Sequence, residues 1–336
     1  MTDRKGLHIS INNREPMKSR LEYLDLTKGI CMLMLIFSHI EVLPDHYILY
    51  YFYFPVFLVI SGFFFPKNLN IIQFIKNRGL KILVPFLFFY LVSYLLFYLG
   101  MTAFPEYMHT DAKGISDIFV QRQWFNGPIW YLLCLFWVNI WLYIVDLIDR
   151  TWIQILAVLS LGYLGAFLGK NYIFMPMMID SSLSSLPFFY LGYMLKSSII
   201  LYVNKYDKYS IVIGSFCLIV TMILAWIFPY NWVGFHTNTI VGNYFLSIVI
   251  SAFAVFAVLF LCKSIKTLPF IAFFGMYSII PFSVHHLIYR PLIVFFDHIN
   301  ICNSLFIVAI MTIIISSLMI PLFKNYLPWV IGIKNK

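Results

Sequence analysis

Charged residues are scarce in this chain. Asp, Glu, Lys and Arg make up only 11% of its 336 residues, whereas hydrophobic residues make up 62%. A soluble domain carries about 25% charged residues, so the composition excludes a soluble fold. The sequence instead predicts an integral membrane protein, and a content of 20% Phe, Tyr and Trp suits its interfaces with the lipid headgroups.

Cysteines are also few, and none occurs in a CxxC pair or near clustered histidines. The five of them lie in or beside apolar stretches, at positions 31, 134, 217, 262 and 302. We therefore expect neither a disulfide framework nor a metal site. The sequence also lacks a P-loop, a GxSxG elbow, an HExxH motif and paired carboxylates within an apolar segment, so it offers no support for the enzyme classes that depend on them.

Apolar runs long enough to cross a bilayer recur along the chain. A crossing helix needs about 17–25 such residues, and ten stretches are candidates: 24–41, 48–66, 80–101, 128–146, 152–169, 182–200, 209–229, 239–262, 270–294 and 303–323. We expect one all-α membrane domain over residues 1–336. Its N-terminal segment, 1–20, is polar and does not resemble a cleavable signal peptide, and its helical bundle spans 24–323.

Basic residues are unevenly distributed among the connecting segments. If the N-terminus is cytoplasmic, 18 of the 23 Lys and Arg residues fall on the cytoplasmic side and four fall outside, with Lys28 inside the first apolar segment. This asymmetry predicts an inner-membrane protein with both termini in the cytoplasm and an external loop near 101–127. The net charge of +9 is then a sign of topology and does not indicate binding to nucleic acid.

Lys28 and His39 lie eleven residues apart in the first apolar segment. At about 100° and 1.5 Å per residue, they share one helix face and are separated by about 16 Å along the axis. Asp25 lies near the same stripe. Ionisable groups within a membrane usually face a bundle interior or a wet cavity and mark function. The alternative is a lysine that reaches the interface and a histidine that bonds between helices.

Three further groups are weaker candidates. Arg78 and Lys81 lie on the cytoplasmic side and suit phosphate binding, although ordinary positive-inside charge also explains them. His285 and its neighbour His286 point about 100° apart, so at most one lines a cavity; hydrogen bonding between helices is the alternative. A last group, near an outer interface, could bind sugar hydroxyls, although helix capping and an aromatic belt explain it about as well; it comprises His236, Asn238, Gly242, Asn243 and Tyr244.

Several stretches together resemble the acyltransferase-3 family of membrane acyltransferases. The first segment carries a basic residue, ten intervening residues and a histidine, which is the hallmark of that family. Other resemblances follow in the family's order, at 54–64, 78–81, 128–132, 186–193 and 275–285. Gly242 and Asn243 resemble the fucose 4-O-acetylase-like subgroup.

The resemblance implies a membrane O-acetyltransferase that uses cytoplasmic acetyl-CoA as co-substrate and needs no bound cofactor. Its acceptor would be a hydroxyl of a cell-envelope or exported glycan or of a lipid-linked sugar. By position, His39 would be catalytic, and Lys28, Arg78 and Lys81 would bind the donor. Lys81 replaces the family's second arginine and lacks its planar fork.

We assign the remaining site residues from their positions. Glu41 is expected to assist His39 by orienting its imidazole, and His285, Asn243 and Trp130 are expected to bind the acceptor. The expected partners are acetyl-CoA, the sugar acceptor and membrane lipids. The sequence does not decide whether the protein forms a homodimer.

Two other functions remain compatible with the residues. One is a transporter or flippase of lipid-linked sugars, and the other is a proton-coupled carrier that uses His39 and His285. A transporter is expected to show inverted repeats or helices broken at matching positions in its two halves, and the sequence shows neither. Acetyl transfer by the purified protein would separate the enzyme from both.

The uneven basic charge leads to a topology prediction. A cysteine introduced at Lys113 should react with a membrane-impermeant thiol reagent in intact cells, or in spheroplasts where an outer membrane blocks access, because its loop is expected to be external. Labelling that appears only after lysis would reverse the orientation.

Overall fold

The computed structural model describes residues 21–42, 46–107, 112–120, 122, 124–265, 268–299, 301 and 304–332. The predicted N-terminal segment 1–20 and Cys302 lie outside these residues.

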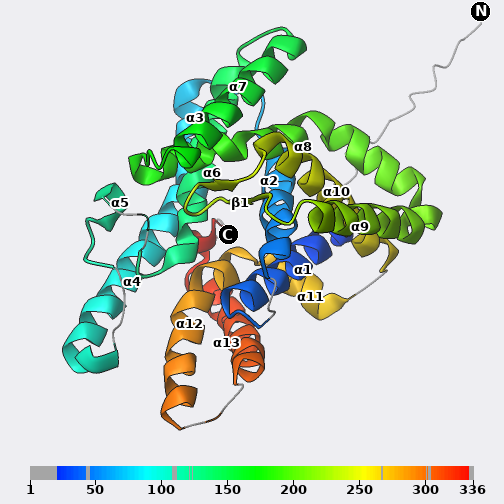
Figure 1. Ribbon diagram of the computed structural model, residues 1–336. Helices are drawn as coiled ribbons and strands as arrows, with labels where there is room; N and C mark the ends of the chain where they lie inside the picture. Colours follow the sequence, from blue (N-terminus) through cyan, green and yellow to red (C-terminus); the bar gives the residue numbers. More distant parts are fainter. Residues whose placement is uncertain are drawn as a thin grey trace, which may run out of the picture.

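Helices make up nearly all of the described chain (Figure 1). The α-helices are α1 Glu22–His39, α2 Tyr53–Phe63, α3 Ile71–Arg78, α4 Val84–Ala103, α5 Asp117–Val120, α6 Trp130–Asp146, α7 Thr151–Lys170, α8 Ile179–Lys205, α9 Ser210–Ile227, α10 Tyr244–Ser264, α11 Pro269–Met276, α12 Ile279–His298 and α13 Leu305–Tyr326. A 3-10 turn, η1 (His46–Tyr51), precedes α2, and a π-helical turn, η2 (Gly79–Leu83), joins α3 to α4.

Eight helical stretches among the described residues are long and apolar enough to cross a membrane. They are Ile71–Ala103, Gly127–Asp146, Thr151–Lys170, Pro176–Lys205, Asp207–Ile227, Tyr244–Ser264, Ile279–His298 and Leu305–Tyr326. The prediction of a helical membrane protein is therefore confirmed. The first two predicted crossings correspond to α1, which carries three charged residues, and to α2, which has only 11 residues. The total of ten crossings and the orientation stay predictions.

A short hairpin interrupts the helical pattern between α9 and α10. Strand β1 (Trp232–Gly234) pairs antiparallel with β2 (Thr239–Val241), with Val233 opposite Ile240. The prediction that helix begins at residue 239 was wrong because the β-branched residues of β2 pair with β1, and α10 begins only at Tyr244. The hairpin lies near the centre of the view in Figure 1 and contacts η1, α7 and α10.

The predicted segment 270–294 is broken into α11 and α12 at Tyr277 and Ser278. Pro281 explains the break, because it has no N–H for the carbonyl of Tyr277 four residues earlier and its ring crowds that carbonyl. The N–H of Ile280 donates to the Tyr277 carbonyl instead, at 2.9 Å. Helix α12 then runs beside α13 at one edge of the molecule (Figure 1).

Glycines allow α1 and α11 to pack in backbone contact. A Cβ at Gly29 would overlap the carbonyl oxygen of Ile271, and one at Gly275 would overlap that of Asp25. Small residues permit such close approach between membrane helices. Because α12 follows α11 directly, this contact also fixes where α12 begins relative to α1.

This contact yields a stability prediction. Gly275→Ala should lower the thermal midpoint of the detergent-solubilised protein and destabilise it by about 1–3 kcal/mol, because overpacking forces the two backbones apart. Gly79→Ala is the matched control, since a Cβ there meets nothing within 4 Å. Equal midpoints for the two variants would contradict the packing argument.

Candidate active site

The last residue of α1 meets α12 inside the bundle. His39 Nδ1 lies 2.9 Å from His285 Nε2, and the two imidazole rings stack with centroids 5.1 Å apart. His285 is fully buried. The sequence expectation placed His285 at the acceptor, whereas the structure places it behind His39, and it does not line the cavity described below.

A backbone carbonyl determines the tautomers of this pair. His285 Nδ1 lies 2.9 Å from the carbonyl oxygen of Pro281, which can only accept, so Nδ1 carries the proton. In a neutral His285, Nε2 then carries a lone pair, and it must accept the hydrogen bond from His39 Nδ1–H. The chain of two bonds leaves a lone pair on His39 Nε2, which is the form that a general base or a nucleophile requires.

His39 lines a cavity of about 320 Å³. Its other lining residues are Leu35, Tyr50, Tyr53, Phe54, Pro128, Trp130, Trp232, Val233, Gly234, Phe235, His236, Thr237 and Phe282. Aromatic rings and histidines dominate this wall, and in the part of the chain that the structure describes it contains no Asp, Glu, Lys or Arg. An apolar wall with a few polar groups that converge is typical of a small-molecule site.

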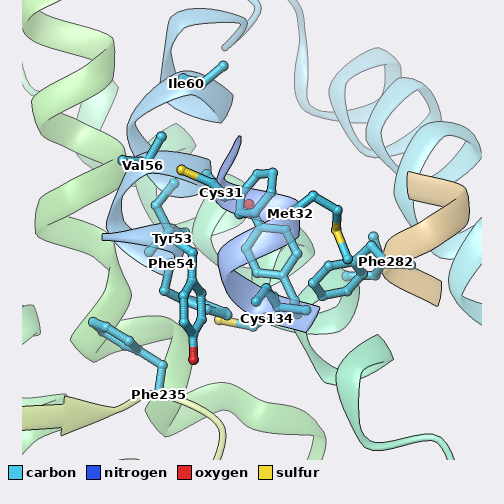
Figure 2. Packing of buried hydrophobic residues seen from close by; sticks show 14 of the residues in the cluster. Cys31, Met32, Tyr53, Phe54, Val56, Ile60, Cys134, Phe235 and Phe282 are labelled. Atoms are coloured by element: carbon cyan, nitrogen blue, oxygen red, sulfur yellow. The ribbon is translucent and has the colours of Figure 1, made fainter. Parts of the chain in front are cut away.

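The aromatic wall is built from elements far apart in the sequence. Trp130, at the start of α6, stacks on Phe54 of α2 with ring centroids 4.7 Å apart and planes 8° apart. Phe54 in turn stacks on Phe235 of the hairpin at 5.3 Å. Figure 2 shows Phe235 and Phe282 approaching the buried cluster around Phe54 from different elements. Trp130 therefore lies in the cavity wall, and its contact with an acceptor stays a prediction.

His236 enters the same wall from the hairpin. Its Nε2 lies 2.8 Å from the carbonyl oxygen of Arg122, so Nε2 carries the proton and Nδ1 carries a lone pair. Its ring lies 5.6 Å from that of Trp130. Burial, together with the nearby positive charge of Arg122, lowers the pKa of His236 to about 4, although the hydrogen bond to the Arg122 backbone raises it. His236 is therefore neutral at pH 7.

A buried ionic network holds the hairpin in place. The guanidinium of Arg122 forms an ion pair with the buried Asp180 and donates to the carbonyl of His236 at 3.1 Å. Asn238 donates to the same Asp180 carboxylate at 3.0 Å. Breaking such a buried pair from one side costs about 3–5 kcal/mol, so this network fixes the hairpin relative to α8.

His286 has a separate partner. The backbone N–H of Gly127 donates to His286 Nδ1 at 3.2 Å, so the proton of a neutral His286 lies on Nε2. Its ring lies 6.2 Å from that of His39 in an edge-on arrangement. The bond ties α12 to the turn that precedes α6.

Two of the expected site residues lie elsewhere. Glu41 is exposed in the turn after α1, with a φ of 56°, and it does not line the cavity. His39 Nδ1 is held by His285. Asn243 caps α10, where its side chain accepts from the N–H groups of Phe245 and Leu246. The capping interpretation therefore accounts for Asn243.

Of the expected donor residues, Lys28 lies on α1, toward its N-terminal end. Lys28 pairs with Asp25 at 2.8 Å, and α1 is continuous from Lys28 to His39. Arg78 donates to the carbonyl of Phe64, just after α2, at 2.6 Å. Lys81 is exposed within the π-helical turn η2. Single π turns are frequent at functional sites.

The sequence interpretation missed most of the cavity wall. Tyr50, Tyr53 and Trp232 were not singled out, and the role of His236 depends on a hairpin that was not predicted. The signal was present in the β-branched and aromatic residues at 232–233 and 239–241, which flank a short polar turn. Among the described residues, no group of three or more His, Cys, Asp or Glu side chains is placed to hold a metal ion.

These features define a polytopic membrane protein with a histidine pair at the wall of an aromatic cavity. The sequence profile of the acyltransferase-3 family, described as an acyltransferase domain, matches residues 21–321. The chain belongs to this family and is a multi-pass membrane acyltransferase. No curated protein and no solved structure matches it.

Proposed function

We propose that the protein is an O-acetyltransferase that moves an acetyl group from cytoplasmic acetyl-CoA to a hydroxyl of a cell-envelope or exported glycan or of a lipid-linked sugar. The observation that supports this best is the bond from His39 Nδ1–H to His285, because it places the proton of a neutral His39 on Nδ1 in a residue that lines an aromatic cavity. Family membership favours an enzyme over a transporter or a proton-coupled carrier.

In the proposed reaction, His39 acts as the general base. Its Nε2 takes the proton of the sugar hydroxyl while the oxygen attacks the thioester carbonyl. The C–S bond then breaks, the new ester forms, and the protonated His39 returns its proton to the departing CoA sulfur. His285 is a positioning residue that keeps Nδ1 of His39 occupied.

Donor binding is assigned to the N-terminal end of α1. Lys28, Arg78 and Lys81 would face the phosphates of acetyl-CoA, and the pantetheine arm would run along α1 to His39, about 16 Å further by helix rise. This arrangement assumes that α1 and α2 also cross the inner membrane, which gives ten crossings with both termini in the cytoplasm.

The proposal includes membership of the fucose 4-O-acetylase-like subgroup. Gly242, with a φ of 74°, and the cap Asn243 form the turn before α10. Backbone geometry explains both residues without a sugar. Membership of the fucose 4-O-acetylase-like subgroup therefore remains a prediction.

The catalytic assignment predicts that His39→Ala lowers transfer from acetyl-CoA by about 10²–10⁴-fold, since that is the usual contribution of a general base. Donor affinity should stay close to wild type, and the thermal midpoint should fall only modestly, because His285 Nε2 loses its hydrogen-bond partner. The measurements are initial rates and acetyl-CoA binding of the purified protein. A variant that folds poorly yet keeps full activity per folded molecule would show that His39 is structural.

Variants of His285 test how the base is held. His285→Leu removes the acceptor for His39 Nδ1–H and should reduce the rate strongly. His285→Gln offers an oxygen near the position of Nε2 and should recover much of that loss. If the glutamine and leucine variants are equally impaired at equal stability, the hydrogen bond does not position His39.

The donor assignment predicts that Arg78→Ala weakens acetyl-CoA binding about ten- to a hundredfold, because a hydrogen bond to a charged group contributes about 1.5–3 kcal/mol. Lys76→Ala is the matched control, since Lys76 is exposed in the same basic stretch. Calorimetric titration of the folded variants gives the comparison. Unchanged affinity in Arg78→Ala would place the donor site elsewhere.

A further inference from the structure

The cavity beside His39 carries information about the acceptor. Resting on the proposed function, we propose that the acceptor enters as a single uncharged sugar unit, and that His236 Nδ1 accepts a hydrogen bond from a second hydroxyl of that unit. His236 is therefore an acceptor-binding residue, distinct from the base.

The absence of charge in the wall selects against ionic acceptors. Among the described residues, those that line the cavity include no Asp, Glu, Lys or Arg. Arg122 contacts the backbone of His236, but its guanidinium pairs with Asp180. A carboxylate, phosphate or ammonium group on the entering sugar would lose its water without gaining an opposite charge, which is strongly unfavourable. Charged parts of a larger acceptor must stay outside the cavity.

The size of the cavity limits what enters. About 320 Å³ lies at the lower end of the range for small-molecule sites, which is roughly 300–1,000 Å³. A single pyranose ring suits this space better than a longer saccharide does. Its apolar C–H face can lie against the aromatic rings of the wall.

The two histidines of the cavity wall are suited to two different hydroxyls of the sugar. His39 Nε2 takes the proton of the hydroxyl that attacks. His236 offers a second lone pair, because its Nε2–H is already donated to the Arg122 carbonyl at 2.8 Å. Thr237, in the same wall, is paired with the hydroxyl of Thr239 at 2.8 Å. His236 Nδ1 is thus well suited to hold a second hydroxyl of the same ring.

The charge claim is tested on the product. Glycans from cells that produce the wild-type protein or His39→Ala are compared by mass spectrometry, and the sugar unit with the additional acetyl group is identified by fragmentation. We expect an uncharged unit. An acetyl group on a uronate, phosphate-bearing or amine-bearing unit overturns this proposal but leaves the acetyltransferase intact. A glycan that gains no acetyl group overturns the proposed function and this inference with it.

The role of His236 is tested by kinetics. The probe is glycan from the same cells, freed of O-acetyl groups with mild alkali. His236→Gln retains an Nε2–H donor for the Arg122 carbonyl but loses the Nδ1 lone pair. Its KM for this glycan should rise about two- to tenfold, the usual contribution of one hydrogen bond, while its KM for acetyl-CoA stays within about twofold. An unchanged glycan KM overturns the assignment.

Two further variants control for folding and for location. Tyr230 lies next to the hairpin, is exposed and does not line the cavity. The variant Tyr230→Phe should therefore change neither KM. If His236→Gln does not fold, His236→Asn replaces it, because Oδ1 of asparagine keeps an acceptor near the position of Nδ1. A folded asparagine variant should keep a glycan KM near the wild-type value, and a KM raised tenfold overturns the proposal.

Discussion

The hydrogen bond between His39 and His285 is the interaction on which the site depends. Each imidazole is a polar group inside an apolar bundle, and leaving its N–H without a partner would be costly. The carbonyl of Pro281 satisfies His285, and His285 satisfies His39. The need to pair buried donors therefore also determines which nitrogen of each neutral imidazole carries the proton.

Backbone packing makes this bond attainable. Gly29 and Gly275 bring α1 and α11 into contact, and Pro281 breaks the helix so that α12 begins with its own direction. The same proline supplies the carbonyl that binds His285. Two glycines and one proline, none of them reactive, thus position the reactive histidine.

The hairpin side of the cavity is held in place by a buried ion pair. The hairpin has only three residues in each strand, which is too little to be stable alone. Arg122 and Asp180 hold it, with Asn238 bonded to the same carboxylate. A charged network behind the wall thus supports a surface that is itself uncharged.

The sequence was most informative where its signals are local. Apolar length predicted the helices, and the spacing of Lys28 and His39 predicted a helix that carries both. The partner of His39 was not predictable because it lies 246 residues away, and Glu41 was assigned to that role because it is close in sequence. The capping role of Asn243 was one of two local interpretations, and only the contacts of its side chain distinguish them.

That sequence separation has a consequence for biosynthesis. Helix α1 precedes every other helix described here, whereas α12, which carries His285, is followed only by α13 among the α-helices. While the intervening helices are being inserted, His39 has neither its hydrogen-bond partner nor most of its cavity wall. The hydrogen bond between His39 and His285 therefore cannot form during insertion until most of the described helices are in the membrane.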